Sequence, residues 1–235
     1  MPHIKVPGGR RWAALLTAVV LSACGSSPPP PPSITVTFVR HAQSAGNASG
    51  LIDTSVPGPS LTALGEQQAQ QAADTLRTRN FDGIFASSMV RTQQTAAPLA
   101  RDLGKPVQVL PGLRELEAGT FEGTPEASAR STYFEAPEQW LKGNRNARIP
   151  GSVDGNQFND RFTAAMQTIY DSGDKNPVAF AHGGSIMLWT MMNVHNPRDS
   201  LLQTNPLPNT GEVVVRGNPS SGWTLVDWDG IETEP

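Results

Sequence analysis

An arginine and a histidine stand side by side at Arg40 and His41, directly after a short run of β-branched and aromatic residues. A neutral imidazole is a good nucleophile, and a neighbouring guanidinium discourages its protonation while it offers planar donors to an oxyanion. The pair therefore indicates attack by His41 on a phosphoryl group that Arg40 would bind. A surface basic pair has the same sequence, so this interpretation depends on the rest of the chain.

Two more apolar segments end in residues of the same kind. Residues 82–88 are expected to form a strand that leads into a helix with Arg91 in its first turn, and the apolar run 178–181 is followed by His182 and two glycines. Because the carboxyl ends of parallel strands meet at one edge of a sheet, these groups can converge. Two arginines, two histidines and a helix N-terminus would form a cradle for a phosphoryl dianion.

Acidic residues follow a third short strand, which the sequence predicts over 107–110. The loop after it carries Glu115 and Glu117. The next segment, residues 124–153, is rich in Pro, Gly, Ser, Arg and Asn and has weak periodicity. It is either a variable surface loop or an irregular excursion, with one short helix, over the site. Its basic residues could favour an anionic substrate or could simply be solvated; they are Arg130, Lys142, Arg145 and Arg148.

The elements that must position these groups alternate between strand and helix. Periodicity predicts helices over 61–79, 88–102, 156–172 and 185–192, and Thr62 can cap the first of them. It also predicts strands over 34–39, 82–88, 107–110, 178–181, 212–216 and 223–228. The last two strands are expected to close one edge of the sheet. The residues after His41 are expected to form a small polar loop. The alternation predicts an α/β fold, a three-layer α/β/α sandwich around a mostly parallel sheet.

Five segments, in order, resemble one known family. They are VRHAQSAGN at 39–47, LTALGEQQA at 61–69, SSMVRTQQTA at 87–96, LRELEAGTFEG at 113–123 and AHGG at 181–184. Together they are similar to the histidine phosphatase superfamily, in its phosphoglycerate-mutase-like branch. The resemblance covers Ile34 to about Trp228 and implies the phosphoglycerate-mutase-like sandwich. Where the family commonly has Arg-His-Gly-Glu, this chain has Ala42 and Gln43 after the histidine. Ala42 is small enough for the same turn, and the phosphoryl chemistry does not require a particular residue at the position of Gln43.

The resemblance implies a role for each matched residue. His41 would be the nucleophile that forms a phosphohistidine, and Glu115 would protonate the leaving oxygen and then activate water. Arg40 and Arg91 would bind phosphate oxygens. His182 would be catalytic and would also donate to the phosphoryl group, and Asn47 would fix the loop and touch the phosphate. No metal and no cofactor is expected, because cationic side chains supply the electrostatic stabilisation.

The first 33 residues are expected to lie outside the folded domain. Residues 1–24 combine basic residues, a short apolar run and the sequence Leu-Ser-Ala-Cys, which is typical of a secretory signal and resembles a bacterial lipobox ending at Cys24. Residues 25–33 form a Pro-rich linker, and 34–235 form the histidine phosphatase domain. We therefore expect export, with a lipid on Cys24 anchoring the protein to the extracytoplasmic face of the cell membrane.

Composition and charge narrow the possible partners and functions. The formal net charge of -3 and the pI near 5.8 give no electrostatic footprint for nucleic acid. The partners expected are a small phosphorylated substrate and the membrane, and the sequence leaves the oligomeric state open. Three functions remain: a phosphatase acting on phosphomonoesters, a phosphoglycerate mutase, and a weakly catalytic lipoprotein that binds a phosphorylated ligand. Export argues against the mutase, because glycolytic intermediates are cytoplasmic.

Overall fold

A computed structural model describes residues 1–4 and 31–234, and one compact unit begins at Pro31. Residues 5–24 of the predicted signal segment, with Cys24, and residues 25–30 of the linker therefore lie outside the described residues. Within the described part of the chain, no helix has both the length and the apolar character that crossing a membrane requires.

The central sheet of this unit has seven strands in the order β3-β2-β4-β1-β5-β6-β7. Neighbours from β3 to β1 are parallel, and β5, β6 and β7 are added antiparallel. The strands are β1 (Ile34–Arg40), β2 (Ile84–Ala86), β3 (Val107–Val109), β4 (Val178–Ala181), β5 (Glu212–Asn218), β6 (Gly222–Trp228) and β7 (Ile231–Glu232). The predicted α/β class with a mostly parallel sheet is confirmed, although the two-residue β7, which was not predicted, occupies the edge.

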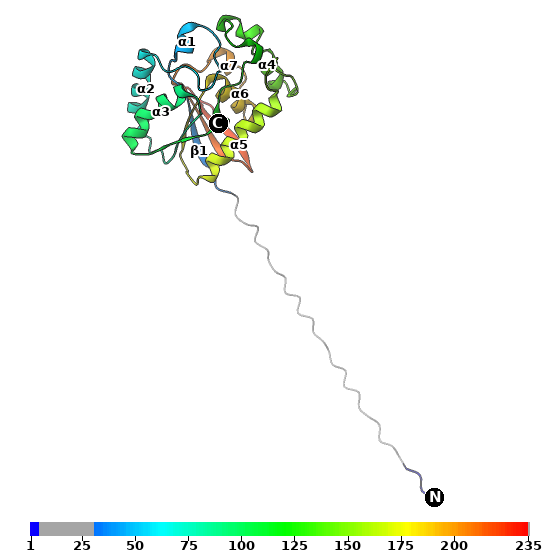
Figure 1. The fold of residues 1–235 in the computed structure, drawn as a ribbon. Helices are drawn as coiled ribbons and strands as arrows, with labels where there is room; N and C mark the ends of the chain where they lie inside the picture. Colours follow the sequence, from blue (N-terminus) through cyan, green and yellow to red (C-terminus); the bar gives the residue numbers. More distant parts are fainter. Residues whose placement is uncertain (5–30, 235) are drawn as a thin grey trace. The chain divides into compact units, whose positions relative to one another are not determined.

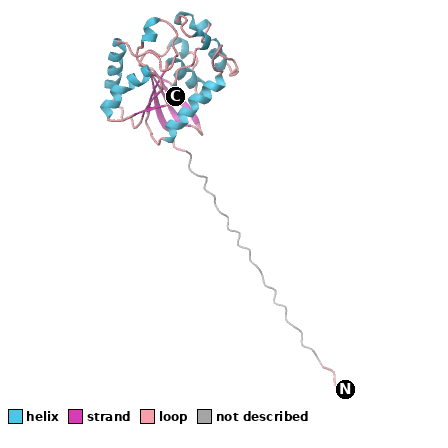
Figure 2. Cartoon of the chain, viewed as in Figure 1, coloured by secondary structure: helices cyan, strands magenta, loops and turns pink. Residues whose placement is uncertain are grey.

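Helices cover both faces of the sheet (Figure 1, Figure 2). Alternate residues of the strands point to opposite sides, so Val39 and Phe180 pack with α2 and α3 whereas Phe38 and Ala181 pack with α5 and α6. The described helices are α1 (Ala45–Ser49), α2 (Ala63–Leu76), α3 (Val90–Leu103), α4 (Glu135–Leu141), α5 (Gly155–Asp171), α6 (Gly183–Asn193) and α7 (Leu201–Thr204), with 3-10 turns at Pro111–Leu113, Gly119–Phe121 and Glu126–Ser131.

Local sequence explains where two of these helices begin. The hydroxyl of Thr62 accepts a hydrogen bond from the Gly65 amide at 3.0 Å, which is the predicted N-cap of α2. The polar segment after His41, by contrast, is not a loop throughout. Ser44 and Asn47 form a capping box that starts the short helix α1, and Gly50 ends it in the left-handed conformation.

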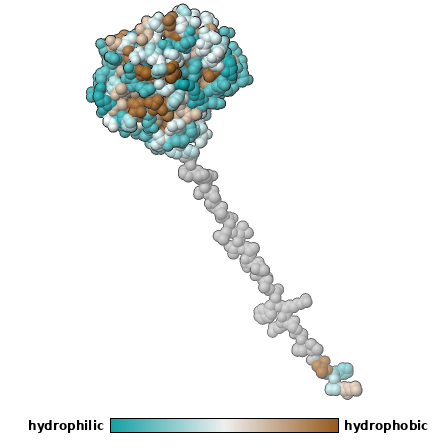
Figure 3. Space-filling view, in the orientation of Figure 1, coloured by the Kyte–Doolittle hydropathy of each residue, from teal (hydrophilic) through white to brown (hydrophobic). Residues whose placement is uncertain are grey.

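The register of the sheet brings the predicted site residues together. Arg40 at the end of β1 pairs with Ala181 at the end of β4, so His41 and His182 leave adjacent strands side by side. Figure 1 shows α1, α4 and α7 gathered at this end of the domain. The face seen in Figure 3 is a mosaic in which hydrophobic patches are interrupted by hydrophilic residues.

Candidate active site

His41 is held at the carboxyl end of β1 by its own backbone and ring. Its amide donates to the carbonyl of Ala181 at 3.0 Å, and its ring Nδ1 lies 2.7 Å from the carbonyl of Ala42. A carbonyl oxygen can only accept, so Nδ1 carries the proton. The lone pair of the imidazole is therefore on Nε2, which is the atom available for nucleophilic attack.

Arg91 and Arg40 surround this nitrogen. From the first turn of α3, the Nε–H of Arg91 donates to Nε2 of His41 at 3.1 Å, and Nη2 donates to the carbonyl of Asp53 at 3.2 Å. Nη1 of Arg40 donates to the carbonyl of Leu207 at 2.6 Å. Nε of Arg40 and Nη1 of Arg91 are buried without a partner among the described residues. Buried donors of this kind are ready to bind an oxyanion.

The electrostatics keep the nucleophile neutral. Burial lowers the pKa of His41 well below the ordinary 6.5, and the positive charges of Arg91 and Arg40 lower it further. Burial also lowers the pKa of both arginines, which remain cations because a guanidinium stays protonated in proteins. A neutral imidazole next to two cations suits attack on a dianion.

His182 lies behind His41. It is fully buried, and its ring centroid is 5.1 Å from that of His41 at an interplanar angle of 63°. Its Nε2 shares a hydrogen bond of 2.8 Å with Oγ of Ser87, whereas Nδ1 is buried without a partner among the described residues. Burial, followed by the charge of Arg91, lowers the pKa of His182 well below 6.5. The histidines are thus adjacent as expected, and direct contact of His182 with a phosphoryl group stays a prediction.

Glu115 is positioned by the N-terminus of α6. Its carboxylate accepts from the amides of Gly184 at 3.1 Å and Ser185 at 2.8 Å, and also from Leu116 at 2.9 Å. The amides at the start of α6 thus bind this acid, and a helix N-terminus that contacts the phosphoryl group stays a prediction. Glycine permits this close approach, because a Cβ at residue 184 would lie 2.9 Å from Oε1 of Glu115.

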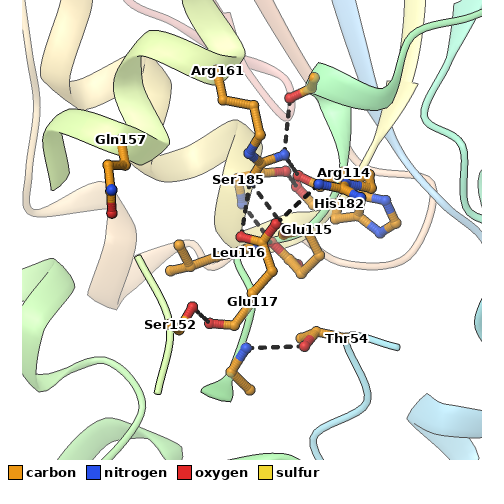
Figure 4. Close-up of polar contacts among 12 residues, drawn as sticks. Thr54, Arg114, Glu115, Leu116, Glu117, Ser152, Gln157, Arg161, His182 and Ser185 are labelled. Atoms are coloured by element: carbon orange, nitrogen blue, oxygen red, sulfur yellow. Dashed lines mark hydrogen bonds and ion pairs between the residues drawn. The ribbon is translucent and has the colours of Figure 1, made fainter. Parts of the chain in front are cut away.

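Arg161 fixes the loop that carries Glu115. From α5, its Nη1 donates to the carbonyls of Gly112 at 3.0 Å and Arg114 at 3.1 Å, and its Nη2 donates to the carbonyl of Glu115 at 3.2 Å. Nη2 also pairs with Glu117 at 3.4 Å (Figure 4). Glu117 is therefore an anchor of the loop, paired with both Arg161 and Arg114.

Asn47 organises the other wall of the site. Its Oδ1 accepts from the Ser44 amide at 3.1 Å and from Nδ2 of Asn209 at 3.3 Å. Asn209 in turn donates to the carbonyl of His41 at 2.9 Å. Asn47 thus fixes its loop as predicted, and its contact with phosphate stays a prediction.

One cavity of about 600 Å³ contains most of the predicted site. Arg40, His41, Asn47, Arg91 and Glu115 all line it, whereas His182 does not. The segment 124–153 supplies another part of the wall, so of its two interpretations the excursion over the site is the one observed. Among the described residues no group of three or more His, Cys, Asp or Glu side chains could hold a metal ion.

Sequence reasoning missed several supporting residues. Arg161 lies three residues after the buried Phe158 and four before the buried Ala165 of α5, and a cation at this helical spacing was a signal that could have been used. Tyr133, whose hydroxyl donates to the carbonyl of Leu116, and Asn209 had no comparable signal, because their partners are backbone groups distant in sequence.

Comparisons with known proteins agree with this geometry. A family model described as the histidine phosphatase superfamily, branch 1, matches residues 36–230. PE-PGRS family protein PE_PGRS11 of Mycobacterium tuberculosis is 52% identical over 219 residues, which cover 86% of this chain and 38% of the relative. A probable phosphoglycerate mutase, GpmB of Yersinia enterocolitica, is 34% identical over 200 residues, which cover 82% of this chain and 91% of the relative.

Solved structures share the fold at low sequence identity. A mycobacterial glucosyl-3-phosphoglycerate phosphatase is 22% identical with a TM-score of 0.69, and the match covers 84% of this chain and 100% of the other. Phosphoserine phosphatase from Entamoeba histolytica is 20% identical with a TM-score of 0.67, over 84% of this chain and 98% of the other.

Proposed function

The chain belongs to the histidine phosphatase superfamily and is an enzyme of that family, and from this premise we propose that it hydrolyses phosphomonoesters through a phosphohistidine, outside the cytoplasm. One observation carries the proposal. The lone pair of His41 Nε2, the guanidinium of Arg91 that donates to it and the carboxylate of Glu115 belong to the same cavity.

The first step would transfer the phosphoryl group to His41. Nε2 forms the new bond to phosphorus while the bond to the ester oxygen breaks, and Glu115, which must be protonated when this step begins, gives its proton to that oxygen. Arg40 and Arg91 bind the equatorial oxygens, and the unpartnered Arg40 Nε and Arg91 Nη1 gain acceptors. The bond from Nδ1 to the Ala42 carbonyl holds the ring in the reactive tautomer throughout.

The second step would hydrolyse the phosphohistidine. The alcohol leaves, water takes its place, and the carboxylate of Glu115 removes a proton as the water oxygen attacks phosphorus. The bond between phosphorus and Nε2 breaks, so inorganic phosphate is released and His41 is neutral again. Glu115 recovers the proton that it gave up in the first step.

Location is a separate part of the proposal. Its support is the sequence alone: basic residues, a short apolar run and Leu-Ser-Ala-Cys ending at Cys24, followed by a Pro-rich spacer. A lipid on Cys24 would anchor the protein to the membrane and leave the domain on its extracytoplasmic side. The substrates would then be phosphomonoesters present outside the cytoplasm.

A mutase is the second candidate, because a relative at 34% identity carries the name probable phosphoglycerate mutase. The two functions differ in the fate of the phosphoryl group. The purified full chain should release inorganic phosphate from a panel of phosphomonoesters. Conversion of 3-phosphoglycerate to 2-phosphoglycerate, primed by the bisphosphate and without net phosphate release, would support the mutase instead.

A further inference from the structure

The cavity extends well beyond the phosphate cradle, and its remaining wall is largely apolar. We infer that the alcohol part of the substrate is an apolar alkyl or aryl group, an inference that rests on the proposed function. The lining residues outside the cradle that support it are Leu51, Ile52, Phe134, Leu141, Met187, Leu188, Leu202 and Leu207.

Four of these side chains are packed on one side only. Phe134, Leu141, Met187 and Leu202 contact the main hydrophobic cluster but are only partly buried, and all four line the cavity. They come from three separate elements, namely the start and end of α4, α6 and α7. An apolar group bound between them would cover their remaining exposed surface, which is favourable in proportion to the area removed from water.

The charges around this part of the cavity do not favour a second anionic group. Outside the cradle the charged lining residues are two cations, Arg130 and Lys142, and four anions, Asp53, Glu126, Glu138 and Asp199. Arg130 already lies 3.9 Å from the carboxylate of Glu138. A substrate carboxylate or second phosphate would therefore find no excess of positive charge. The basic residues of segment 124–153 do not form an anion site.

The size of the cavity agrees with a sizeable alcohol. Its volume of about 600 Å³ is in the range that accommodates drug-sized ligands. The cradle takes up part of this volume, because Arg40, His41 and Arg91 must hold the phosphoryl group. The apolar walls are left for the alcohol, and binding it there would help to position the phosphorus next to Nε2 of His41.

Binding of n-alkyl phosphonates tests the inference without requiring turnover. The purified full chain is titrated calorimetrically with ethyl, butyl, hexyl and octyl phosphonate. Because each buried methylene contributes to apolar burial, we expect Kd to fall about threefold per methylene along the series. A Kd that is the same for all four phosphonates would overturn the inference.

Two variants test whether the dependence of Kd on chain length arises at the apolar wall of the cavity. Met187→Gln and Leu202→Gln place amides in the apolar wall. Each should raise the Kd of octyl phosphonate about tenfold and leave the Kd of ethyl phosphonate as in the unaltered protein. Retained ethyl binding shows that each variant is folded. Leu64→Gln is the matched control, because this leucine of α2 is 49% exposed and does not line the cavity. It should leave the Kd values of all four phosphonates unchanged. Equal losses for ethyl and octyl phosphonate would contradict an apolar subsite here.

Phosphate release from the corresponding alkyl phosphates separates this inference from the proposed function. If the phosphonates show the chain-length dependence but no ester releases phosphate, the proposed function fails and the apolar subsite stands. If phosphate is released equally from all alkyl esters, and faster from 3-phosphoglycerate or phosphoserine, the function stands and the apolar preference is wrong.

Discussion

The Nε–H of Arg91 donates to Nε2 of His41 over 3.1 Å. Since Nδ1 of the same ring faces the Ala42 carbonyl, the hydrogen bonds on both nitrogens define one neutral tautomer with its lone pair directed at a cation. An arriving phosphate would give Arg91 stronger, charged acceptors than an imidazole nitrogen. Substrate binding would therefore free the nucleophile at the moment when phosphorus comes within reach.

Arg91→Lys should lower kcat/KM for any phosphomonoester about 100-fold, because a lysine keeps the charge but lacks the planar fork that binds two oxygens and reaches His41. Competitive inhibition by inorganic phosphate should weaken in parallel. Arg101→Ala, at an exposed position of the same helix, is the matched control and should retain activity. Unchanged kinetics in Arg91→Lys would show that Arg91 does not bind the substrate.

The two buried histidines should make stability depend on pH. Burial and nearby arginines hold the pKa of His41 and of His182 well below 6.5 in the folded chain, whereas both titrate near 6.5 when unfolded. Below pH 6.5 the unfolded state therefore binds more protons, and the free energy of unfolding should fall as pH falls, by up to about 1.4 kcal/mol per pH unit for each histidine.

Urea unfolding of the full chain between neutral and acidic pH measures this slope. His41→Gln and His182→Gln should each remove the contribution of one histidine, so both variants should lose less stability on acidification than the unaltered protein. Parallel pH profiles for all three proteins would contradict the buried, neutral state of these residues.

Arg161 should act as a positioning residue for Glu115, since it binds three carbonyls of the loop that carries the acid. In Arg161→Met, kcat/KM for an alkyl phosphate should fall about tenfold or more, because a poor leaving group needs the proton of Glu115. For p-nitrophenyl phosphate the decrease should be small, since nitrophenolate leaves without a proton.

Arg161→Lys should restore part of the activity toward the alkyl phosphate. Arg148→Met removes an arginine that pairs with Asp154 at the surface and serves as the matched control. Equal losses for both leaving groups in Arg161→Met would indicate a general disturbance of the fold instead of a misplaced acid.

Cys24 should carry the lipid if the proposed location is correct. Growth with a labelled fatty acid should mark the full chain in the membrane fraction, and Cys24→Ala should be unlabelled, because Cys24 is the only cysteine of the sequence. Labelling of both proteins to the same extent would show that the anchor, if any, lies elsewhere.

Much of the fold could be predicted because its signals are local. The strand that ends at Arg40 and the run 178–181 are bounded apolar segments, and Thr62 caps α2 as its hydroxyl and position suggest. Helix α1 could not be predicted by periodicity, because its five residues have no apolar face and a capping box starts it. The two residues of β7 are likewise too few to give a pattern.

Of the site, only the reacting side chains could be predicted from the sequence. Arg40, His41, Arg91 and Glu115 line one cavity as the motifs imply. The binding of Glu115 by the amides of α6 could not be foreseen, since it depends on two backbone groups about seventy positions away in the chain. The apolar wall likewise depends on tertiary packing, because it brings α4, α6 and α7 to one cavity.

The central claim is that His41 carries the phosphoryl group and Glu115 serves both steps. With a substrate that has a good leaving group, Glu115→Gln should still transfer phosphoryl to His41, but water attack then lacks its base, so the intermediate should accumulate. His41→Ala should lose nearly all turnover and keep its fold, because the ring follows the end of β1 and lines the cavity.

Rapid quench with a ³²P-labelled phosphomonoester measures this directly. The account predicts an acid-labile, base-stable phosphoenzyme that accumulates in Glu115→Gln and is absent in His41→Ala. Failure to accumulate in Glu115→Gln would contradict the role of Glu115 as the base of the second step, and a phosphoenzyme that persists in His41→Ala would falsify the assignment of the nucleophile.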